Sequence, residues 1–186
     1  MENHRSKSEE FFRVVLQDDL YRQSNIIRYN SIDTIRRQNL GEHHAVVAQL
    51  TVKIIEELVA EGFSIPERTK YVALAAGSIH DMGEIVFSDV NYELKRDNPD
   101  LSEISNRIEH GYICSLQGYK KIFEEAQEDR LAHAIYKMAD ALDLILFVRR
   151  EHKLGNNDSY LDQIERNGYM LADSNFKQIM ALFTLT

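Results

Sequence analysis

Residues 70–84 read KYVALAAGSIHDMGE, an apolar helical pattern that ends in the adjacent pair His80-Asp81. The pattern is preceded by Ser64-Ile65-Pro66-Glu67, in which a Ser is followed by Pro and by Glu three residues on. Such a combination is typical of a helix start, with Ser64 as the cap. We therefore predict a helix from Ser64 to His80, and Gly83 is suited to end it.

Two further polar residues lie on apolar helical faces far away in the sequence. His43 opens a stripe that continues through Val47, Leu50, Ile54 and Leu58, and Asp140 lies within the apolar segment 138–142. A carboxylate on a buried face is costly unless something compensates it. A divalent cation held by His43, His80, Asp81 and Asp140 would do so. Alternatively, Asp140 pairs with Lys137, Arg149 or Arg150, and His43 is simply a packed histidine.

The remaining pattern is helical throughout, with few glycines and prolines and no useful strand alternation. We expect an all-α fold of about six to eight helices. The expected helices cover about residues 8–22, 41–61, 64–80, 84–90, 101–125, 128–153, 160–166 and 173–182. In the first helix, Phe11, Val15 and Leu20 are expected to face inward, and loops are expected through residue 39 and over 91–100.

Length and charge narrow the class of protein. The chain of 186 residues predicts one domain over 1–186, and its net charge of −8 argues against nucleic acid as a partner. A single cysteine, Cys114, excludes an internal disulfide. No signal core or membrane-length apolar run is present, so we expect a cytoplasmic protein without a membrane segment.

Three blocks of sequence resemble the YfbR-type 5′-deoxynucleotidases of the HD-domain phosphohydrolases. The first block is Arg28-Tyr29 followed by RRQNLGEH at 36–43, the second is HDMGEIVFSD at 80–89, and the third is KMADAL at 137–142. The resemblance spans about residues 26–183. It implies an HD-domain helical bundle, usually a homodimer, that releases phosphate from deoxynucleoside 5′-monophosphates by means of metal-activated water.

The resemblance also assigns roles to individual residues. It makes His43, His80, Asp81 and Asp140 the ligands of one divalent metal ion, and Glu84 the acidic group in the chemistry. Arg28 would orient the phosphate, and Asp89 would contact the nucleoside. The remaining substrate candidates are Tyr29, Lys95 and Lys137. Mn, Co, Fe, Zn and Mg all remain open as the metal.

Two departures from the family pattern fall at positions that would contact the sugar and base of the substrate, not at positions that would carry out the chemistry. Tyr29 stands where the family has Trp, and Asp89-Val90-Asn91-Tyr92 replaces its Asp-Leu-Pro-Thr stretch. A deoxynucleoside triphosphate triphosphohydrolase, cleavage of a nucleotide second messenger, and a nucleotide sensor without turnover therefore remain alternatives. Glu84 and Arg28 favour an enzyme over a sensor, because a sensor needs no acid–base group. Arg36 is expected to support Glu42 or to contact phosphate, and His110 and His133 are weak candidates for a second metal.

Overall fold

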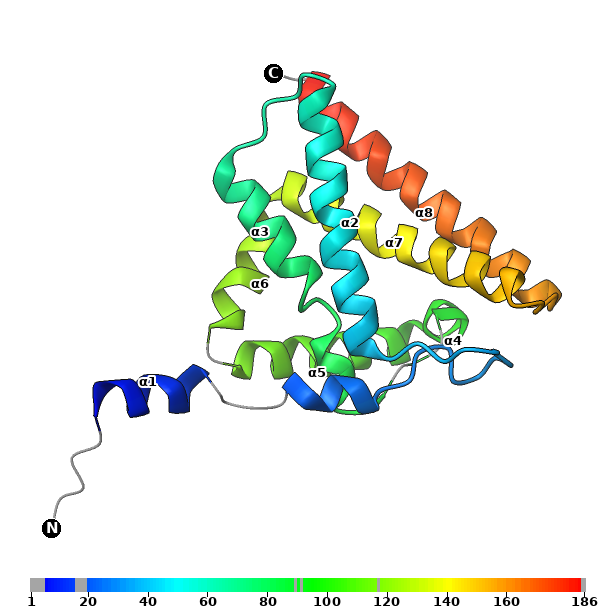
Figure 1. Cartoon of the computed structure of the whole chain (residues 1–186), viewed down its shortest axis with the longest axis horizontal. Helices are drawn as coiled ribbons and strands as arrows, with labels where there is room; N and C mark the ends of the chain where they lie inside the picture. Colours follow the sequence, from blue (N-terminus) through cyan, green and yellow to red (C-terminus); the bar gives the residue numbers. More distant parts are fainter. Residues whose placement is uncertain (1–5, 16–19, 89, 91, 117, 185–186) are drawn as a thin grey trace, which may run out of the picture.

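The computed structural model describes residues 6–15, 20–88, 90, 92–116 and 118–184. Within them the chain forms eight α-helices and two 3-10 helices, with a single isolated β-bridge between Ile27 and Asn39 (Figure 1). The expected all-α fold is confirmed. The elements are α1 (Lys7–Val15), η1 (Leu20–Asn25), α2 (Leu40–Ala60), α3 (Glu67–Gly77), η2 (Met82–Ile85), α4 (Tyr92–Asp97), α5 (Pro99–Ser115), α6 (Tyr119–Glu128), α7 (Arg130–Lys153) and α8 (Ser159–Thr184).

The core lies where α2, α3 and α7 pack together. Asn39 caps α2 by accepting the backbone N–H of Glu42 at 2.9 Å, so this helix begins one residue before the expected start at Gly41. The expected stripe is buried at His43, Val47, Ile54 and Leu58, and Leu50 is partly buried. Small residues of α7, including Ala132 and Ala139, let the three helices approach closely. This packing fixes the polar ends of the helices relative to one another.

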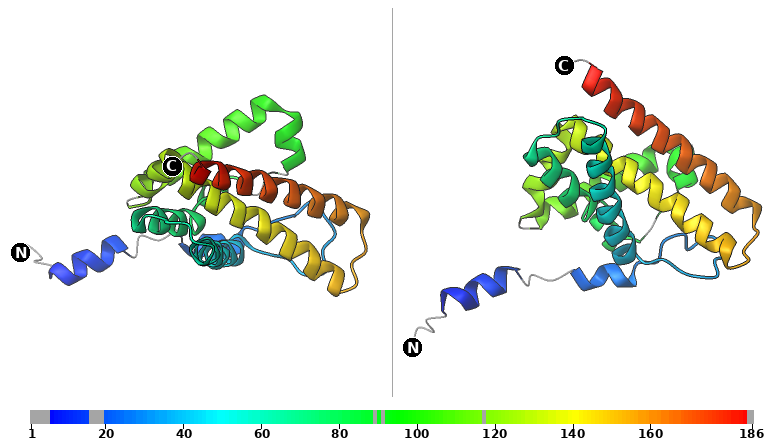
Figure 2. Two further views of the ribbon diagram at one scale, coloured as in Figure 1. Left: turned by 90° about the horizontal axis from the view of Figure 1, so that it is seen from above. Right: turned by 45° about the horizontal axis from the view of Figure 1, so that its top comes forward.

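Helix α8 runs antiparallel to α7 along most of its length, as the views in Figure 2 show. The two short helices expected here are wrong: the chain forms one continuous helix through Asn167-Gly168. A Cβ on Gly168 would lie 2.8 Å from side-chain atoms of Leu144 and Ile145. This glycine therefore serves the close crossing of the two helices, and tertiary packing overrides its low helix propensity.

The predicted helix over 64–80 is wrong at both ends. Helix α3 spans Glu67–Gly77. Its N-cap residue is Pro66, and no side chain forms a capping hydrogen bond there. Ser64 therefore does not cap it. His80-Asp81 lies in the turn between α3 and η2 rather than within a helix. Turn backbone lets these two adjacent side chains approach the same centre, which successive positions of a helix would direct about 100° apart.

Three other boundaries differ from the expectation. The segment 91–100, expected to be a loop, contains the short helix α4, and the segment 84–90, expected to be helical, contributes only the end of η2. Pro99 opens α5 as expected. The single helix expected over 101–125 is instead α5 and α6, because Gly118 adopts a φ of +94° that no helix continues through.

Helix α1 stands apart from the body of the protein (Figure 1). Helix α1 ends at Val15, and η1 begins at Leu20, so the one helix expected over 8–22 is not formed. Phe11 and Val15 are 63% and 54% exposed, which contradicts their expected inward position. The side chain of Leu20 lies outside the described residues. None of the described helices combines the length and apolarity needed to cross a membrane.

Candidate functional site

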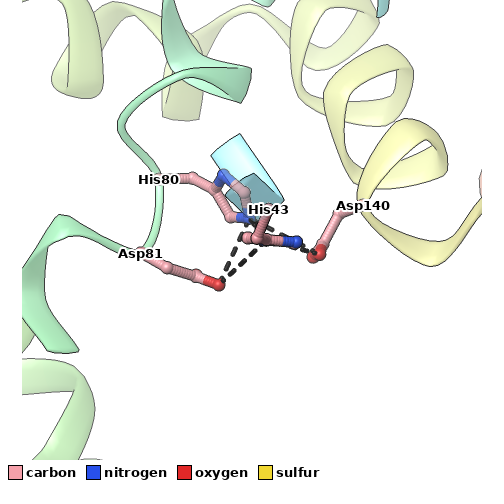
Figure 3. A group of neighbouring side chains, drawn as sticks. All are labelled: His43, His80, Asp81 and Asp140. Carbon is pink, nitrogen blue, oxygen red and sulfur yellow. Dashed lines mark hydrogen bonds and ion pairs between the residues drawn. The ribbon is translucent and has the colours of Figure 1, made fainter. Parts of the chain in front are cut away.

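His43, His80, Asp81 and Asp140 converge on one point from three parts of the fold (Figure 3). His43 lies in the first turn of α2, His80-Asp81 in the turn after α3, and Asp140 in the middle of α7. One potential ligand atom of each lies within 4.8 Å of all the others. The Nε2 atoms of the two histidines are 3.3 Å apart, and the carboxylate oxygens lie 3.4–3.5 Å from them.

The hydrogen bonds on the far side of each imidazole indicate what this point binds. Nδ1 of His43 donates to Asp143 at 2.7 Å, and Nδ1 of His80 donates to the carbonyl of Gly77 at 3.2 Å. In the neutral rings both Nε2 atoms therefore carry lone pairs directed at each other. Two carboxylates, which only accept, complete the group. Four acceptors facing one another need a cation, and the two-His, two-Asp set suits a divalent transition metal.

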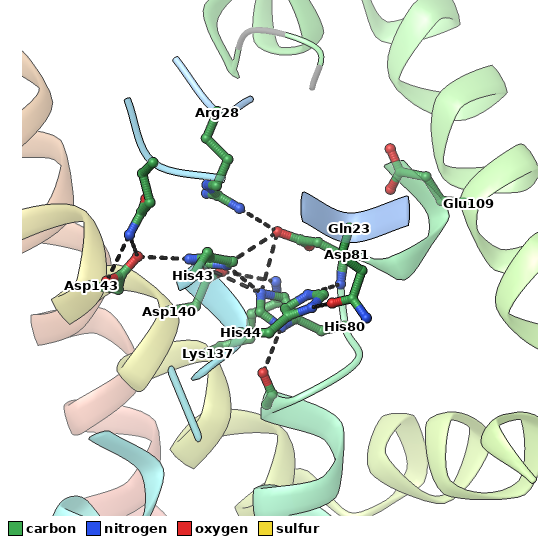
Figure 4. A network of polar contacts seen from close by, with 12 residues as sticks. Gln23, Arg28, His43, His44, His80, Asp81, Glu109, Lys137, Asp140 and Asp143 are labelled. Carbon is green, nitrogen blue, oxygen red and sulfur yellow. Dashed lines mark hydrogen bonds and ion pairs between the residues drawn. The ribbon is translucent and has the colours of Figure 1, made fainter. Parts of the chain in front are cut away.

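The backbone of Asp81 is held in place by a chain of hydrogen bonds through His44 to Gln23 (Figure 4). Its N–H donates to Nε2 of His44 at 3.3 Å, and Nδ1 of His44 in turn donates to Gln23 at 2.7 Å. Burial and the nearby histidines lower the pKa of His44, so it remains a neutral acceptor. His44 therefore supports the site without belonging to the four-residue cluster.

Two cationic side chains contact the carboxylates of the cluster. Arg28 contacts Asp81 at 2.9 Å, and Lys137 contacts Asp140 at 3.2 Å. Desolvation opposes ionisation of Asp81 and Asp140, but the histidines and these cations hold the pKa of both carboxyl groups low. The sequence alternative that Asp140 pairs with Lys137 is therefore also correct, because Asp140 faces Lys137 with one oxygen and the histidines with the other. Arg149 instead pairs with Glu165.

A pocket of about 410 Å³ opens beside the cluster and is bounded on one side by Asp140. Its volume lies within the range of small-molecule sites. Of the sequence candidates, Arg28, Tyr29, Glu84, Lys95 and Lys137 all line it. Asp89 lies outside the described residues. The pocket thus brings the phosphate and acid–base candidates together with one of the four metal candidates, Asp140.

Glu84 and Tyr29 enter this pocket from constrained positions. Glu84 lies within η2 and is 7% exposed, so it is held in a largely dry environment next to the cluster. Tyr29 stacks on Phe147 with ring centroids 4.2 Å apart, and it adopts a φ of +55°. One face of its ring is thus occupied by the core, although the residue also lines the pocket. Burial raises the pKa of its hydroxyl.

Other candidates from the sequence lie elsewhere. Arg36 contacts Glu42 at 3.1 Å on the surface, so it supports Glu42 rather than lining the pocket. His110 lies near Cys114, and His133 contacts Tyr136. Neither histidine belongs to the metal cluster found in the described part of the chain.

Sequence reasoning missed the carboxylates that support the site from behind. Asp143 is 2% exposed and accepts from Gln38 as well as from His43. Glu151 is fully buried and accepts the backbone N–H groups of Ile35 and Arg36 at 2.7 and 2.9 Å. Both lie on α7, and Asp143 follows Asp140 by three residues on an apolar helix, a spacing that would have revealed it. No comparable spacing in the sequence indicates the hydrogen bonds that Glu151 accepts from Ile35 and Arg36.

The helical arrangement and the two-His, two-Asp cluster define an HD-domain protein, and solved structures of that class share the fold. An HD-domain phosphohydrolase from Listeria innocua aligns with a TM-score of 0.65 at 15% identity, covering 88% of this chain and 76% of that one. The PH0347 protein of Pyrococcus horikoshii gives 0.69 at 17% identity, with coverages of 91% and 96%. The cyanophage S-2L phosphohydrolase DatZ, solved with dA and one catalytic Zn²⁺, gives 0.59 at 22% identity, with coverages of 90% and 96%.

The particular family follows from the sequence itself. The profile of the 5′-deoxynucleotidase YfbR-like family matches residues 15–184, nearly the whole chain. The chain therefore belongs to the YfbR-like 5′-deoxynucleotidase family, as the three sequence blocks predicted. No protein of curated function matches it.

Proposed function

We propose that the protein is a metal-dependent 5′-deoxynucleotidase that releases phosphate from deoxynucleoside 5′-monophosphates. One observation carries the proposal: a single pocket joins the ligand cluster at Asp140 to Arg28, Lys137 and Glu84. Family membership and the dA and Zn²⁺ of the related phage enzyme support a nucleotide and a metal here. When bound, a divalent cation would neutralise phosphate charge and promote ionisation of a water molecule. Mn, Co, Fe, Zn and Mg all suit the donor set.

Arg28 is suited to orient the phosphate. Its guanidinium is buried, and one of its nitrogens contacts Asp81, while its Nε has no hydrogen-bond partner within the described residues. Burial opposes its charge, but Tyr29, Glu84 and Asp81 raise its pKa, so it remains a cation throughout the physiological range. A planar guanidinium with donors still available binds phosphate oxygens at two points.

Glu84 is suited to move the proton. It lines the pocket next to the ligands, and its carboxylate is largely withdrawn from solvent. In this position it can accept a proton from the attacking water or deliver one to the leaving 5′-oxygen. Asp81 has a double role in the proposal, as a metal ligand and as the residue that holds Arg28.

The charge of the pocket favours a monophosphate over a triphosphate. Three cationic side chains line its described walls, Arg28, Lys95 and Lys137, and each contacts a carboxylate: Asp81, Glu109 and Asp140. A triphosphate would bring two further phosphate groups without additional cations to balance them. Triphosphohydrolase activity with the same site remains the alternative, and nucleotide sensing without turnover is the alternative of another class.

Assembly and location are proposed on weaker grounds. The family resemblance supports a homodimer, which light scattering coupled to size exclusion would test. The single cysteine supports a cytoplasmic location. Asp89 remains a proposed nucleoside contact on the resemblance alone.

The test is release of phosphate or triphosphate from a panel of deoxynucleoside mono- and triphosphates, with Mn²⁺ or Co²⁺ added. We expect phosphate from the monophosphates and a loss of at least about 100-fold in kcat for Glu84→Ala, as for removal of a general acid–base group. Glu165→Ala, which removes the partner of the exposed Arg149 outside the pocket, is the matched control and is expected to lose far less. Triphosphate release would favour the alternative enzyme, and absence of any turnover would favour the sensor.

A further inference from the structure

Helix α8 forms one wall of the pocket, and this wall carries no charge. It contributes Tyr160, Ile164, Asn167, Leu171 and Asn175, which follow one another at steps of three and four residues. They therefore form a single stripe along the helix. Every charged group of the pocket comes from other elements: Arg28, Glu84, Lys95, Lys137 and Asp140. A substrate with one anionic end would direct its uncharged part to α8.

The orientation of this stripe is fixed by the close contact at Gly168. An ideal Cβ there would lie 2.8 Å from Leu144 and Ile145 and 3.3 Å from the carbonyl of Ala141. Rotation of α8 is thereby restricted at the residue that follows Asn167. Since Ala141 is adjacent to the metal-ligand candidate Asp140, the contact also fixes the position of Asn167 along the axis of α8 relative to the cluster.

The two amides of the stripe differ in their partners. Asn175 donates to the carbonyl of Leu171 in its own helix at 2.9 Å. Asn167 is half-buried, and within the described part of the chain its amide makes no hydrogen bond. Its neighbours along the stripe, Ile164 and Leu171, are apolar. A ligand that covers this amide must offer a donor and an acceptor, or it removes a polar group from water without compensation.

Building on the proposed function, we propose that Asn167 binds the edge of the nucleobase and makes turnover dependent on the base. An asparagine amide pairs with adjacent donor and acceptor groups on a base edge, and a flat ring fits between apolar walls. Neither the sugar-phosphate nor inorganic phosphate has such an edge. Ile32 and Leu144 line the same pocket and, like Tyr160 of the stripe, pack against the hydrophobic cluster that contains Ile164, so they supply the apolar surroundings.

The experiment compares kcat/KM for the four 2′-deoxynucleoside 5′-monophosphates with kcat/KM for 2-deoxyribose 5-phosphate, which has no base. For Asn167→Ala we expect a loss of about 10-fold on nucleotides that exceeds the loss on the base-free substrate, with a changed order among the bases. Asn167→Asp, which keeps the shape but removes the donors, provides a second variant. Gln178→Ala, at an exposed position of the same helix that does not line the pocket, is the matched control, and its effect is expected to be small and equal for all substrates.

Equal losses on nucleotides and on the base-free substrate would overturn the proposal, as would a base-dependent effect in Gln178→Ala alone. Binding of the four 2′-deoxynucleosides by calorimetry separates this inference from the proposed function. If the wild type hydrolyses no nucleotide, the proposed function fails. In that case nucleoside binding weakened by Asn167→Ala would still support the role of Asn167, and unchanged binding would exclude it.

Discussion

The carboxylate of Asp143 accepts the Nδ1–H of His43 at 2.7 Å, directly behind the face that His43 presents to the metal cluster. This bond fixes the tautomer in which Nε2 is free to bind a cation. For Asp143→Asn we expect a loss of roughly 10- to 100-fold in metal affinity, the usual cost of losing such a partner. Calorimetric titration of the metal-free protein with Mn²⁺ or Zn²⁺ measures it.

The control for this prediction is Gln38→Ala. Gln38 donates to the same carboxylate at 3.0 Å but does not contact the imidazole. Its removal is expected to weaken metal binding less than Asp143→Asn does. Identical affinities for the wild type and Asp143→Asn would show that the hydrogen bond does not influence the ligand.

Metal binding itself is expected to stabilise the fold. A ligand that binds only the native state raises the free energy of unfolding, by about 2.7 kcal/mol at 100 times its Kd. We expect added Mn²⁺, Co²⁺ or Zn²⁺ to raise the Tm of the wild type and a chelator to reverse the change. His80→Ala should lose the response, whereas His110→Ala, which lies outside the cluster, should keep it. A response retained by His80→Ala would contradict the four-residue site.

Gly83 is expected to tolerate no side chain. An ideal Cβ there would lie 2.3 Å from the Cα of Glu109, a backbone atom of α5 that cannot give way easily. Gly83→Ala must therefore shift η2 and displace Glu84. We expect a destabilisation of about 1–3 kcal/mol and a reduced kcat. Urea unfolding and turnover of deoxynucleoside monophosphates are the measurements.

Gly111→Ala provides the matched control on α5, because nothing lies within 4 Å of its ideal Cβ. There the higher helix propensity of alanine should stabilise the protein by up to about 1 kcal/mol. If both variants behaved alike, the close approach of η2 to α5 would not be the cause.

Glu151 is expected to stabilise the loop that carries Arg28 and Tyr29. It accepts two backbone N–H groups from Ile35 and Arg36, and Asn156 donates to it at 2.9 Å. Glu151→Gln replaces one acceptor oxygen with an NH2 group, which then faces N–H donors of the loop. We therefore expect a loss of about 1–3 kcal/mol in the free energy of unfolding at neutral pH. Glu165→Gln, which removes a partner of the exposed Arg149, should cost less than about 1 kcal/mol.

The stabilisation that Glu151 provides should decrease as the pH falls. Desolvation opposes its ionisation, but the hydrogen bonds from Asn156 and the two backbone groups lower its pKa below the ordinary value. Its contribution is therefore present at neutral pH and is lost as the pH falls through the lowered pKa. The difference in unfolding free energy between the wild type and Glu151→Gln should shrink in acid. A constant difference would show that the charge contributes nothing.

Local signals in the sequence suggested the four-residue cluster, and the family resemblance assigned its members as ligands. His43 and Asp140 interrupt apolar stripes, and burial of such groups needs a reason that can be inferred without coordinates. The α8 wall of the pocket carries no such signal, since an asparagine is ordinary on any helix surface. Asn167-Gly168 even suggested a helix end, because the contact that requires the glycine comes from α7, distant in sequence.

The boundaries that failed did so for similar reasons. Ser64 carries the local signs of a cap, but the chain uses Pro66 instead. The break between α5 and α6 occurs at Gly118. A glycine can also lie within a helix, so the sequence does not show the turn that accompanies the packing of α6 against α3. Phe11 and Val15 form a helical pattern in α1 without a core to receive them.

The ligand cluster draws on residues separated by nearly a hundred positions, with Asp140 arriving last from the ribosome. A growing chain that ends before α7 holds only His43, His80 and Asp81, and it lacks Asp143 to orient the first of them. Tight capture of an ion must therefore wait until α7 has been synthesised. The identity of the metal is consequently decided by the pool that the chain encounters after α7 has been added.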